Sequence, residues 1–209
     1  MVCLPRPDDP AQDDPRRGPG AGRLVDLTPS RYDDELWELV SEDPGPPPKT
    51  LREFVRSLGH AERVLDLGCG DGRLSAELDA GELTAADVSP VALERARRRL
   101  PAARMAELEP DGPLPFDDGT FDLVLCAETL EHVRDVQLLL SEIRRVLRPG
   151  GVLGLSTPAN LPLGPQPDPL SPHLRFFTRR SLRRLLRELG FEVESLERRS
   201  GTLLARATR

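Results

Sequence analysis

The stretch that decides the fold is Val64-Leu65-Asp66-Leu67-Gly68-Cys69-Gly70-Asp71-Gly72-Arg73-Leu74. Its apolar first half predicts a buried strand, and the glycines at alternate positions predict a tight turn that leads into a helix. Glycine lets the backbone come close to a ligand and adopts positive φ angles without steric cost. The start of a helix adds unpaired N–H groups. We therefore expect a nucleotide-type ligand at this turn.

Length and composition predict one α/β domain. The chain has 209 residues, of which 38% are hydrophobic, which is enough for one core and short for two. The net charge of −6 argues against general affinity for nucleic acid, because no positive field attracts the phosphate backbone. Three widely spaced cysteines indicate neither a disulfide framework nor a zinc site. No apolar run reaches the roughly 20 residues that cross a bilayer. We expect a cytoplasmic monomer or homodimer that does not bind membranes.

The N-terminal part of the chain divides into a tail and two helices. Residues 1–28 are rich in proline and charge and are predicted to be disordered, because they cannot bury enough apolar surface. Residues 29–60 are predicted to hold helices that cap the core, over residues 31–40 and 51–58. The first of these helices contains Tyr32 and Trp37, which either pin it to the domain or form a wall over the acceptor substrate. Residues 61–209 are the predicted ligand-binding domain.

Strand and helix patterns alternate after residue 60. This alternation predicts a Rossmann-like α/β fold, with a doubly wound, mostly parallel sheet in a three-layer αβα arrangement. Strands are expected at residues 63–67, 83–87, 103–106, 121–126 and 152–156, and helices at residues 73–78, 90–100, 136–147 and 181–189. Pro149-Gly150-Gly151 is expected to end the third of these helices. Two last strands, at residues 191–197 and 202–207, predict an antiparallel C-terminal hairpin.

The spacing of the glycines distinguishes two classes of ligand. A dinucleotide-binding turn has glycine at its first, third and sixth positions, but Gly68 and Gly70 are followed by Arg73 in the sixth position. Asp66 and Asp71 add negative charge, which repels a pyrophosphate and suits a ligand with an ammonium and a sulfonium group. The pattern therefore favours S-adenosylmethionine over NAD.

Four motifs in order carry a resemblance to class I S-adenosylmethionine-dependent methyltransferases of the type 11 kind. They are Val64–Gly72, Ala86-Asp87-Val88-Ser89, Leu114–Val124 and Arg145–Gly151. The chain is similar in this respect to ubiquinone-biosynthesis and natural-product methyltransferases. The resemblance covers residues 50–209 and is specific for fold and cofactor, but it says much less about the methyl acceptor.

The resemblance also implies a set of cofactor-binding residues. They lie at or near the ends of the first four expected strands: Asp66, Gly68, Cys69, Gly70, Asp87, Val88, Glu107, Leu108 and Cys126. In the family the glycines contact the methionine part, the acid at Asp87 accepts hydrogen bonds from both ribose hydroxyls, and residues 107–108 frame the adenine. We expect both cysteines to be small packing residues beside the cofactor and not nucleophiles.

Two histidines are the candidates for catalysis. His132 follows the fourth expected strand, at the carboxyl edge where ligands bind in such sheets. It is the expected base for a hydroxyl acceptor, with a structural role as the alternative. His173 ends the proline-rich loop after the fifth strand, which in this family commonly faces the acceptor. We predict in-line transfer of a methyl group to O, N or C of a small molecule.

A second hypothesis places a metal ion in the same region. Glu128, Glu131, His132 and His173 resemble the metal ligands of the small-RNA terminal 2′-O-methyltransferases, whose divalent ion binds the terminal ribose hydroxyls. The basic tail strand and the longer histidine-rich signature of that family are missing here. RNA is therefore the alternative acceptor, and a non-catalytic S-adenosylmethionine-binding protein is a further alternative.

Overall fold

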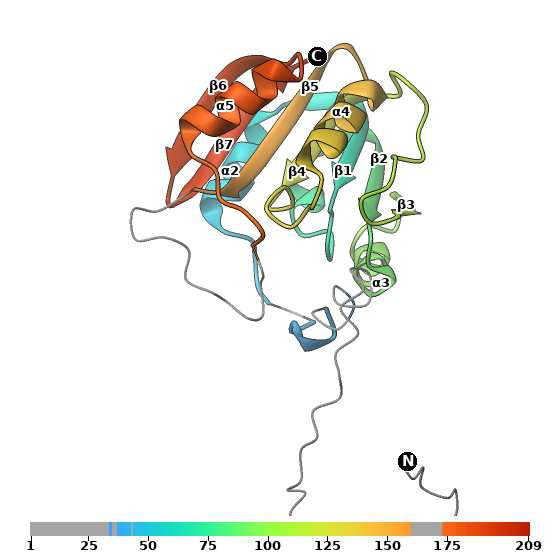
Figure 1. Cartoon of the computed structure of the whole chain (residues 1–209). Coiled ribbons are helices and arrows are strands. Elements are labelled where there is room, and N and C mark those ends of the chain that lie inside the picture. Colours follow the sequence, from blue (N-terminus) through green and yellow to red (C-terminus); the bar gives the residue numbers. More distant parts are fainter. Residues whose placement is uncertain (1–33, 35–36, 43, 160–172) are drawn as a thin grey trace, which may run out of the picture.

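The computed structural model describes residues 34, 37–42, 44–159 and 173–209. Within them, seven strands form one sheet in the order β3-β2-β1-β4-β5-β7-β6, with helices on both faces (Figure 1). The strands are β1 (His60–Leu67), β2 (Asp79–Asp87), β3 (Arg104–Glu107), β4 (Phe121–Ala127), β5 (Leu147–Pro158), β6 (Glu192–Arg199) and β7 (Thr202–Thr208). The helices are α2 (Lys49–Ser57), α3 (Pro90–Arg99), α4 (Val136–Val146) and α5 (Arg179–Glu188). The predicted Rossmann-like three-layer fold is confirmed.

The sheet is parallel from β3 to β5 and antiparallel at its end. Leu67 pairs with Ala86 and Ala127 pairs with Ser156, so the carboxyl ends of the parallel strands meet at one edge. β7 runs antiparallel to both β5 and β6. Ser200 and Gly201 connect these last two strands with φ angles of 48° and 86°, as in the tight turns that suit twisted hairpins. The predicted C-terminal hairpin is confirmed.

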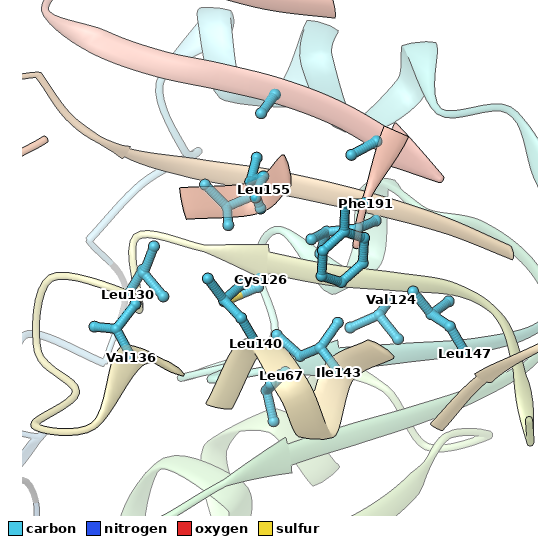
Figure 2. Packing of buried hydrophobic residues seen from close by; sticks show 14 of the residues in the cluster. Leu67, Val124, Cys126, Leu130, Val136, Leu140, Ile143, Leu147, Leu155 and Phe191 are labelled. Atoms are coloured by element: carbon cyan, nitrogen blue, oxygen red, sulfur yellow. The ribbon is translucent and has the colours of Figure 1, made fainter. Parts of the chain in front are cut away.

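Apolar side chains are buried on both faces of the sheet, because successive residues of a strand point to opposite sides. On one face, Leu140 and Ile143 of α4 lie against Val124 and Cys126 of β4 (Figure 2). Leu182 and Leu186 of α5 belong to the same cluster. On the other face, Val55 of α2 packs in a cluster with Val64 and Leu125. This rigid sheet fixes the positions of the loops at its carboxyl edge.

Our prediction of a helix over residues 73–78 is wrong. Only Ser75–Glu77 form a single turn of 3-10 helix, η1, and Leu78 is already extended with a ψ angle of 139°. Length explains the difference: β1 ends at Leu67 and β2 begins at Asp79, so the glycine turn leaves too few residues for a stable α-helix.

The expected role of Pro149-Gly150-Gly151 is also wrong. The helix α4 ends earlier, because Leu147 is extended and pairs directly with Phe121 of β4. The pairing then continues from Leu123 to Val152, so the proline and the glycines form an irregularity inside β5. Proline and glycine occur in strands mainly at such bulges.

The segments beside the sheet are described in part. Residues 1–28, Tyr32 and residues 160–172 lie outside the described residues, while Trp37–Leu39 are helical as expected. Ala159 and Phe177 pair through a parallel bridge, and the Ala159 N–H donates to the Gly201 carbonyl at 2.8 Å. In the described part of the chain, every helix is too short or too polar to cross a membrane.

Candidate functional site

The glycine turn after β1 has the backbone that the sequence predicts. Gly68 and Gly70 have φ angles of 75° and 54°, in the region that side chains rarely adopt. A Cβ atom on Gly68 would lie 2.3 Å from Thr129 Oγ1. The Thr129 hydroxyl itself has the carbonyls of Leu67 and Ala127 within hydrogen-bond distance, at 3.3 and 3.0 Å. The turn is thus packed against the loop after β4, and only glycine fits at position 68.

Asp66 supports the turn from inside the sheet. Its carboxylate is buried and accepts a hydrogen bond of 2.5 Å from Ser75 Oγ in η1. Burial raises the pKa of Asp66 to about 7, while the Ser75 hydrogen bond lowers it and the charge of Asp87 raises it further. Asp66 therefore ties β1 to the segment behind the turn, in agreement with a role in shaping the pocket.

Asp87, at the end of β2, offers the carboxylate that the family uses for a ribose. Its Oδ2 accepts a hydrogen bond from the Gly70 N–H at 2.8 Å and its Oδ1 accepts one from the Ser89 N–H at 3.0 Å. Burial raises its pKa, and these hydrogen bonds oppose the shift. Each oxygen keeps a further lone pair, so the fixed carboxylate can still accept two hydroxyl donors. These residues fit a nucleoside cofactor.

Asp71 does not have the electrostatic role that the sequence suggested. Its carboxylate is buried and forms ion pairs with Arg73 at 2.9 Å and with Arg99 at 3.3 Å. Two arginines balance this charge, so it does not distinguish a sulfonium from a pyrophosphate. The spacing of the glycines carries that distinction.

Two of the remaining cofactor candidates lie beside Asp87, at the end of β3. Glu107 pairs with Asp87 across β2 and β3, and the Leu108 N–H donates to the Asp87 carbonyl at 2.9 Å. Cys69 and Cys126 are free and buried, and burial raises the pKa of both thiols. A buried thiol that stays protonated is a poor nucleophile, which agrees with the packing role expected for both.

The loop after β4 brings two acidic side chains to the neighbouring strand end. Glu128 has a φ angle of 52°, which is unusual for a residue with a side chain. It accepts a hydrogen bond of 2.7 Å from Ser156 Oγ of β5. Glu131 is 1% exposed, and its Oε2 accepts a hydrogen bond of 2.9 Å from Thr157 Oγ1. The end of β5 thus orients both acids.

Glu131 lies beside both candidate histidines. His132 Nε2 is 3.9 Å from Glu131 Oε1, and the rings of His132 and His173 are 5.1 Å apart edge to face. One ligand atom from each of the three residues lies within 4.8 Å of the others. Among the described residues, none gives Glu131 Oε1 a hydrogen bond. Burial, and then the charge of Glu128, raise the pKa of Glu131 to about 8.

Sequence reasoning missed the residues that hold this site in shape. They are the hydroxyl side chains Ser75, Thr129, Ser156 and Thr157, which contact the turn, Asp66 and the two glutamates. The positions of Thr129, Ser156 and Thr157 at the carboxyl ends of β4 and β5 were the available signal, whereas Ser75 lies in η1. Hydroxyl side chains are common there for other reasons, so the signal is weak without partners in view.

Comparison with known proteins agrees with this geometry. Residues 65–155 match the family described as a methyltransferase domain. The chain is 32% identical over 151 residues to the mitochondrial ubiquinone biosynthesis O-methyltransferase of Schizosaccharomyces pombe, covering 66% of this chain and 48% of that protein. It is 42% identical over 132 residues to the demethylmenaquinone methyltransferase of Clavibacter sepedonicus, covering 60% and 49%. The chain spans about half the length of these curated relatives.

Solved structures share the same architecture. An S-adenosylmethionine-dependent methyltransferase from Mesorhizobium loti superposes with a TM-score of 0.64 at 22% identity, over 81% of this chain and 100% of that one. The [4+2]-cyclase SpnF superposes with a TM-score of 0.70 at 19% identity, over 85% and 94%. At these identities the likeness concerns the fold alone.

Fold and site together define a class of protein. It is an α/β protein with a nucleoside cofactor site at the carboxyl ends of β1 and β2, where Gly70 and Asp87 are joined by a hydrogen bond. The match assigns the domain at residues 65–155 to the class I S-adenosylmethionine-dependent methyltransferases. The cofactor of this family is S-adenosylmethionine.

Proposed function

We propose that this protein transfers a methyl group from S-adenosylmethionine to O, N or C of a small-molecule acceptor. The observation that carries the proposal is the position of two sites at one sheet edge. The glycine turn and Asp87 lie at the ends of β1 and β2, and the cluster of Glu131, His132 and His173 lies beyond the neighbouring β4. Donor and acceptor are thereby held close, which is the main requirement of an in-line displacement.

On the donor side, the protein binds and orients the cofactor. Gly68 and Gly70 present their backbone to the methionine part, Asp87 accepts the ribose hydroxyls, and Glu107 and Leu108 border the adenine. When bound, S-adenosylmethionine supplies an electrophilic methyl group on a sulfonium. Cys69 and Cys126 are buried and take no part in the transfer.

On the acceptor side, His132 takes the proton of a hydroxyl acceptor. Its ring is 39% exposed, so a substrate can reach it, and Glu131 lies 3.9 Å from its Nε2. An amine acceptor needs only to arrive neutral, so His132 then positions the substrate. His173, in edge-to-face contact with His132, borders the same space. The free thiols Cys69 and Cys126 support a reducing compartment, for which we propose the cytoplasm.

The test is a methyl-transfer screen of source-cell metabolites with the isotope-labelled cofactor, followed by measurement of S-adenosylhomocysteine formation. With the acceptor in hand, His132→Ala should lower kcat about 100-fold or more for a hydroxyl acceptor. His60→Ala is the matched control, because His60 is exposed at the opposite end of β1. Unchanged turnover in His132→Ala removes His132 as the base.

A second candidate function uses a divalent metal ion. The favouring observation is the convergence of Glu131, His132 and His173 within 4.8 Å, where buried Glu131 Oε1 has no hydrogen bond among the described residues. Carboxylate and imidazole suit a divalent ion. Glu128 lies outside this group of three, although its charge acts on Glu131. Such an ion would bind an acceptor with two neighbouring hydroxyls, as at the 3′ end of an RNA.

Chelation separates the two candidates. A metal-assisted enzyme loses activity with a chelator and regains it with Mg²⁺, Mn²⁺ or Zn²⁺, and His173→Ala abolishes that rescue. Activity that survives the chelator unchanged eliminates the metal. Short RNAs that end in a 2′,3′-diol or in a 2′-deoxyribose then test RNA as the acceptor, and the net charge of −6 speaks against it.

The fold alone does not settle which reaction takes place. One structural neighbour is named a [4+2]-cyclase, and a non-catalytic protein would keep the cofactor site as well. Calorimetric binding of S-adenosylmethionine without transfer to any tested acceptor favours those alternatives. Absence of binding removes the methyltransferase proposal itself.

A further inference from the structure

A short segment before α2 lies across the cofactor turn. We call it the N-terminal strap and define it as the described residues 34, 37–42 and 44–45. It lies beside α3 at the edge of the sheet where β1 and β2 end (Figure 1). The sequence left open whether its aromatic residues pin the helix or cover the acceptor. In the structure Trp37 packs on the domain at Gly70, which is on the donor side.

Trp37 packs directly on the second glycine of the turn. A Cβ atom on Gly70 would lie 2.6 Å from Trp37 Cζ2 and 2.8 Å from Cη2. Gly70 is therefore required by the indole as well as by its positive φ angle. The same backbone is the one that comes close to the cofactor, so a ligand bound at the turn has the indole as its neighbour.

Asp34 reaches the other end of the cofactor site. Its Oδ1 accepts a hydrogen bond of 2.5 Å from Ser89 Oγ, and the Val91 N–H lies at 3.5 Å. Ser89 also caps α3 and donates its N–H to Asp87. The charge of Asp34 contributes to the raised pKa of Asp87, so the two carboxylates are within electrostatic range. The strap thus borders the carboxylate that holds the ribose.

Two arginines also hold the described residues of the strap in place. The Arg95 guanidinium lies 5.8 Å from the centre of the Trp37 ring and donates to the Val40 carbonyl at 2.9 Å. Arg73 donates to the Gly45 carbonyl at 3.0 Å. Leu39 is 73% exposed. Exposed polar and cation–π contacts are individually weak, so the strap opens more easily than the core.

We propose that the N-terminal strap is the outer wall of the cofactor site, that Trp37 contacts the bound cofactor beside Gly70, and that the strap opens for cofactor exchange. The inference depends on the cofactor and is independent of the acceptor. It assigns binding residues outside the four sequence motifs, from a part of the chain that precedes the matched domain at residues 65–155.

The test uses the single tryptophan of the chain as a reporter. The emission of Trp37 in the full chain should change saturably with S-adenosylmethionine or S-adenosylhomocysteine, with the Kd that calorimetry gives. Trp37→Ala should raise that Kd about fivefold and speed dissociation, because one aromatic contact is worth about 1 kcal/mol. Trp37→Phe should restore most of the affinity.

Two controls separate contact from simple packing. Leu39→Ala lies in the same strap on an exposed side chain and should leave the Kd unchanged. Arg95→Gln should speed dissociation, because it releases Trp37 and the Val40 carbonyl together. If calorimetry shows saturable binding of the cofactor while the Trp37 emission stays constant, the inference is wrong. It is also wrong if Trp37→Ala loses thermal stability but keeps its Kd. If calorimetry shows no binding at all, the cofactor assignment fails first.

Discussion

The donor and acceptor sides of this sheet edge are built from different chemistry. On the donor side, Gly68 and Gly70 act through the backbone, and two N–H groups fix the carboxylate of Asp87. On the acceptor side, Glu131 and His132 act through side chains, and they meet His173 from a distant part of the chain. Apart from Asp87, the donor side depends on backbone groups that the fold fixes, whereas the second cluster consists entirely of side chains. The cofactor follows from the matched domain, and the acceptor that we propose depends on the side chains of the second cluster.

The largest effect is expected on the donor side. Asp87→Ala removes the acceptor of two ribose hydroxyls and leaves the Gly70 N–H without its partner. Affinity for S-adenosylmethionine should fall about 100-fold or more, because two hydrogen bonds to a charged group contribute about 3 kcal/mol together. Calorimetry measures the change, with Asp79→Ala at the exposed start of β2 as the control. A Kd within about threefold of wild type would contradict the ribose assignment.

Substitution of two glycines by alanine tests how strictly the turn after β1 requires glycine. Gly68→Ala combines a φ angle of 75° with a Cβ atom placed 2.3 Å from Thr129, whereas Gly59→Ala has a φ angle of 80° and open space. Denaturant unfolding should show a loss of about 3 kcal/mol for Gly68→Ala and about 1 kcal/mol for Gly59→Ala. Equal losses would mean that the contact with Thr129 contributes nothing.

The acceptor side should respond to pH. The pKa of folded Glu131 is raised to about 8, so the folded protein holds a proton that the unfolded chain has released above its ordinary pKa near 4.5. Stability must then fall as pH rises through that range. Glu131→Gln cannot titrate, so its stability relative to wild type should rise by about 2 kcal/mol from mildly acidic to mildly alkaline pH.

Denaturant unfolding across that pH range gives the measurement for Glu131. Glu53→Gln, on the exposed side of α2, is the matched control and should follow the wild type. If the difference in unfolding free energy between wild type and Glu131→Gln stays constant with pH, Glu131 is ionised throughout this range. Its pKa is then not raised in the folded protein.

The smallest effect belongs to the cysteine that lies between the two glycines. Cys69→Ala should change kcat less than about twofold, because burial keeps the thiol protonated and unreactive. A thiol reagent should modify Cys69 and Cys126 slowly in the native protein and fast after unfolding. A large loss of activity in Cys69→Ala would show that the donor side uses a second side chain besides Asp87.

The donor side was readable from sequence because its signals are local. The glycine spacing and the acid after the second strand lie within about twenty residues, and each records one backbone requirement. Asp71 shows the limit of that reasoning: its charge looked like a ligand signal, but Arg73 and the distant Arg99 balance it. A charge count along the sequence cannot show such a partner.

The acceptor side and the strap depend on contacts between distant residues. Thr157 orients Glu131 across 26 positions, and Trp37 meets Gly70 across 33. Amphipathic spacing predicted the helix that carries Trp37, but it could not say which surface the indole covers. The incorrect helix prediction after the glycine turn has a different reason. The spacing of Leu74 and Leu78 favours a helix, but the few residues before β2 leave no room for one.

The bridge between Ala159 and Phe177 has a consequence for how this scaffold diversifies. Ala159 is held by this bridge to Phe177 and by the hydrogen bond that its N–H donates to the Gly201 carbonyl. For a loop closed at fixed ends, doubling the length costs only about 0.6 kcal/mol of chain entropy. Insertions and deletions between the two anchors are therefore absorbed with little effect on β5 or α5. Chain length can therefore vary between Ala159 and Phe177 while the turn after β1 stays unaltered.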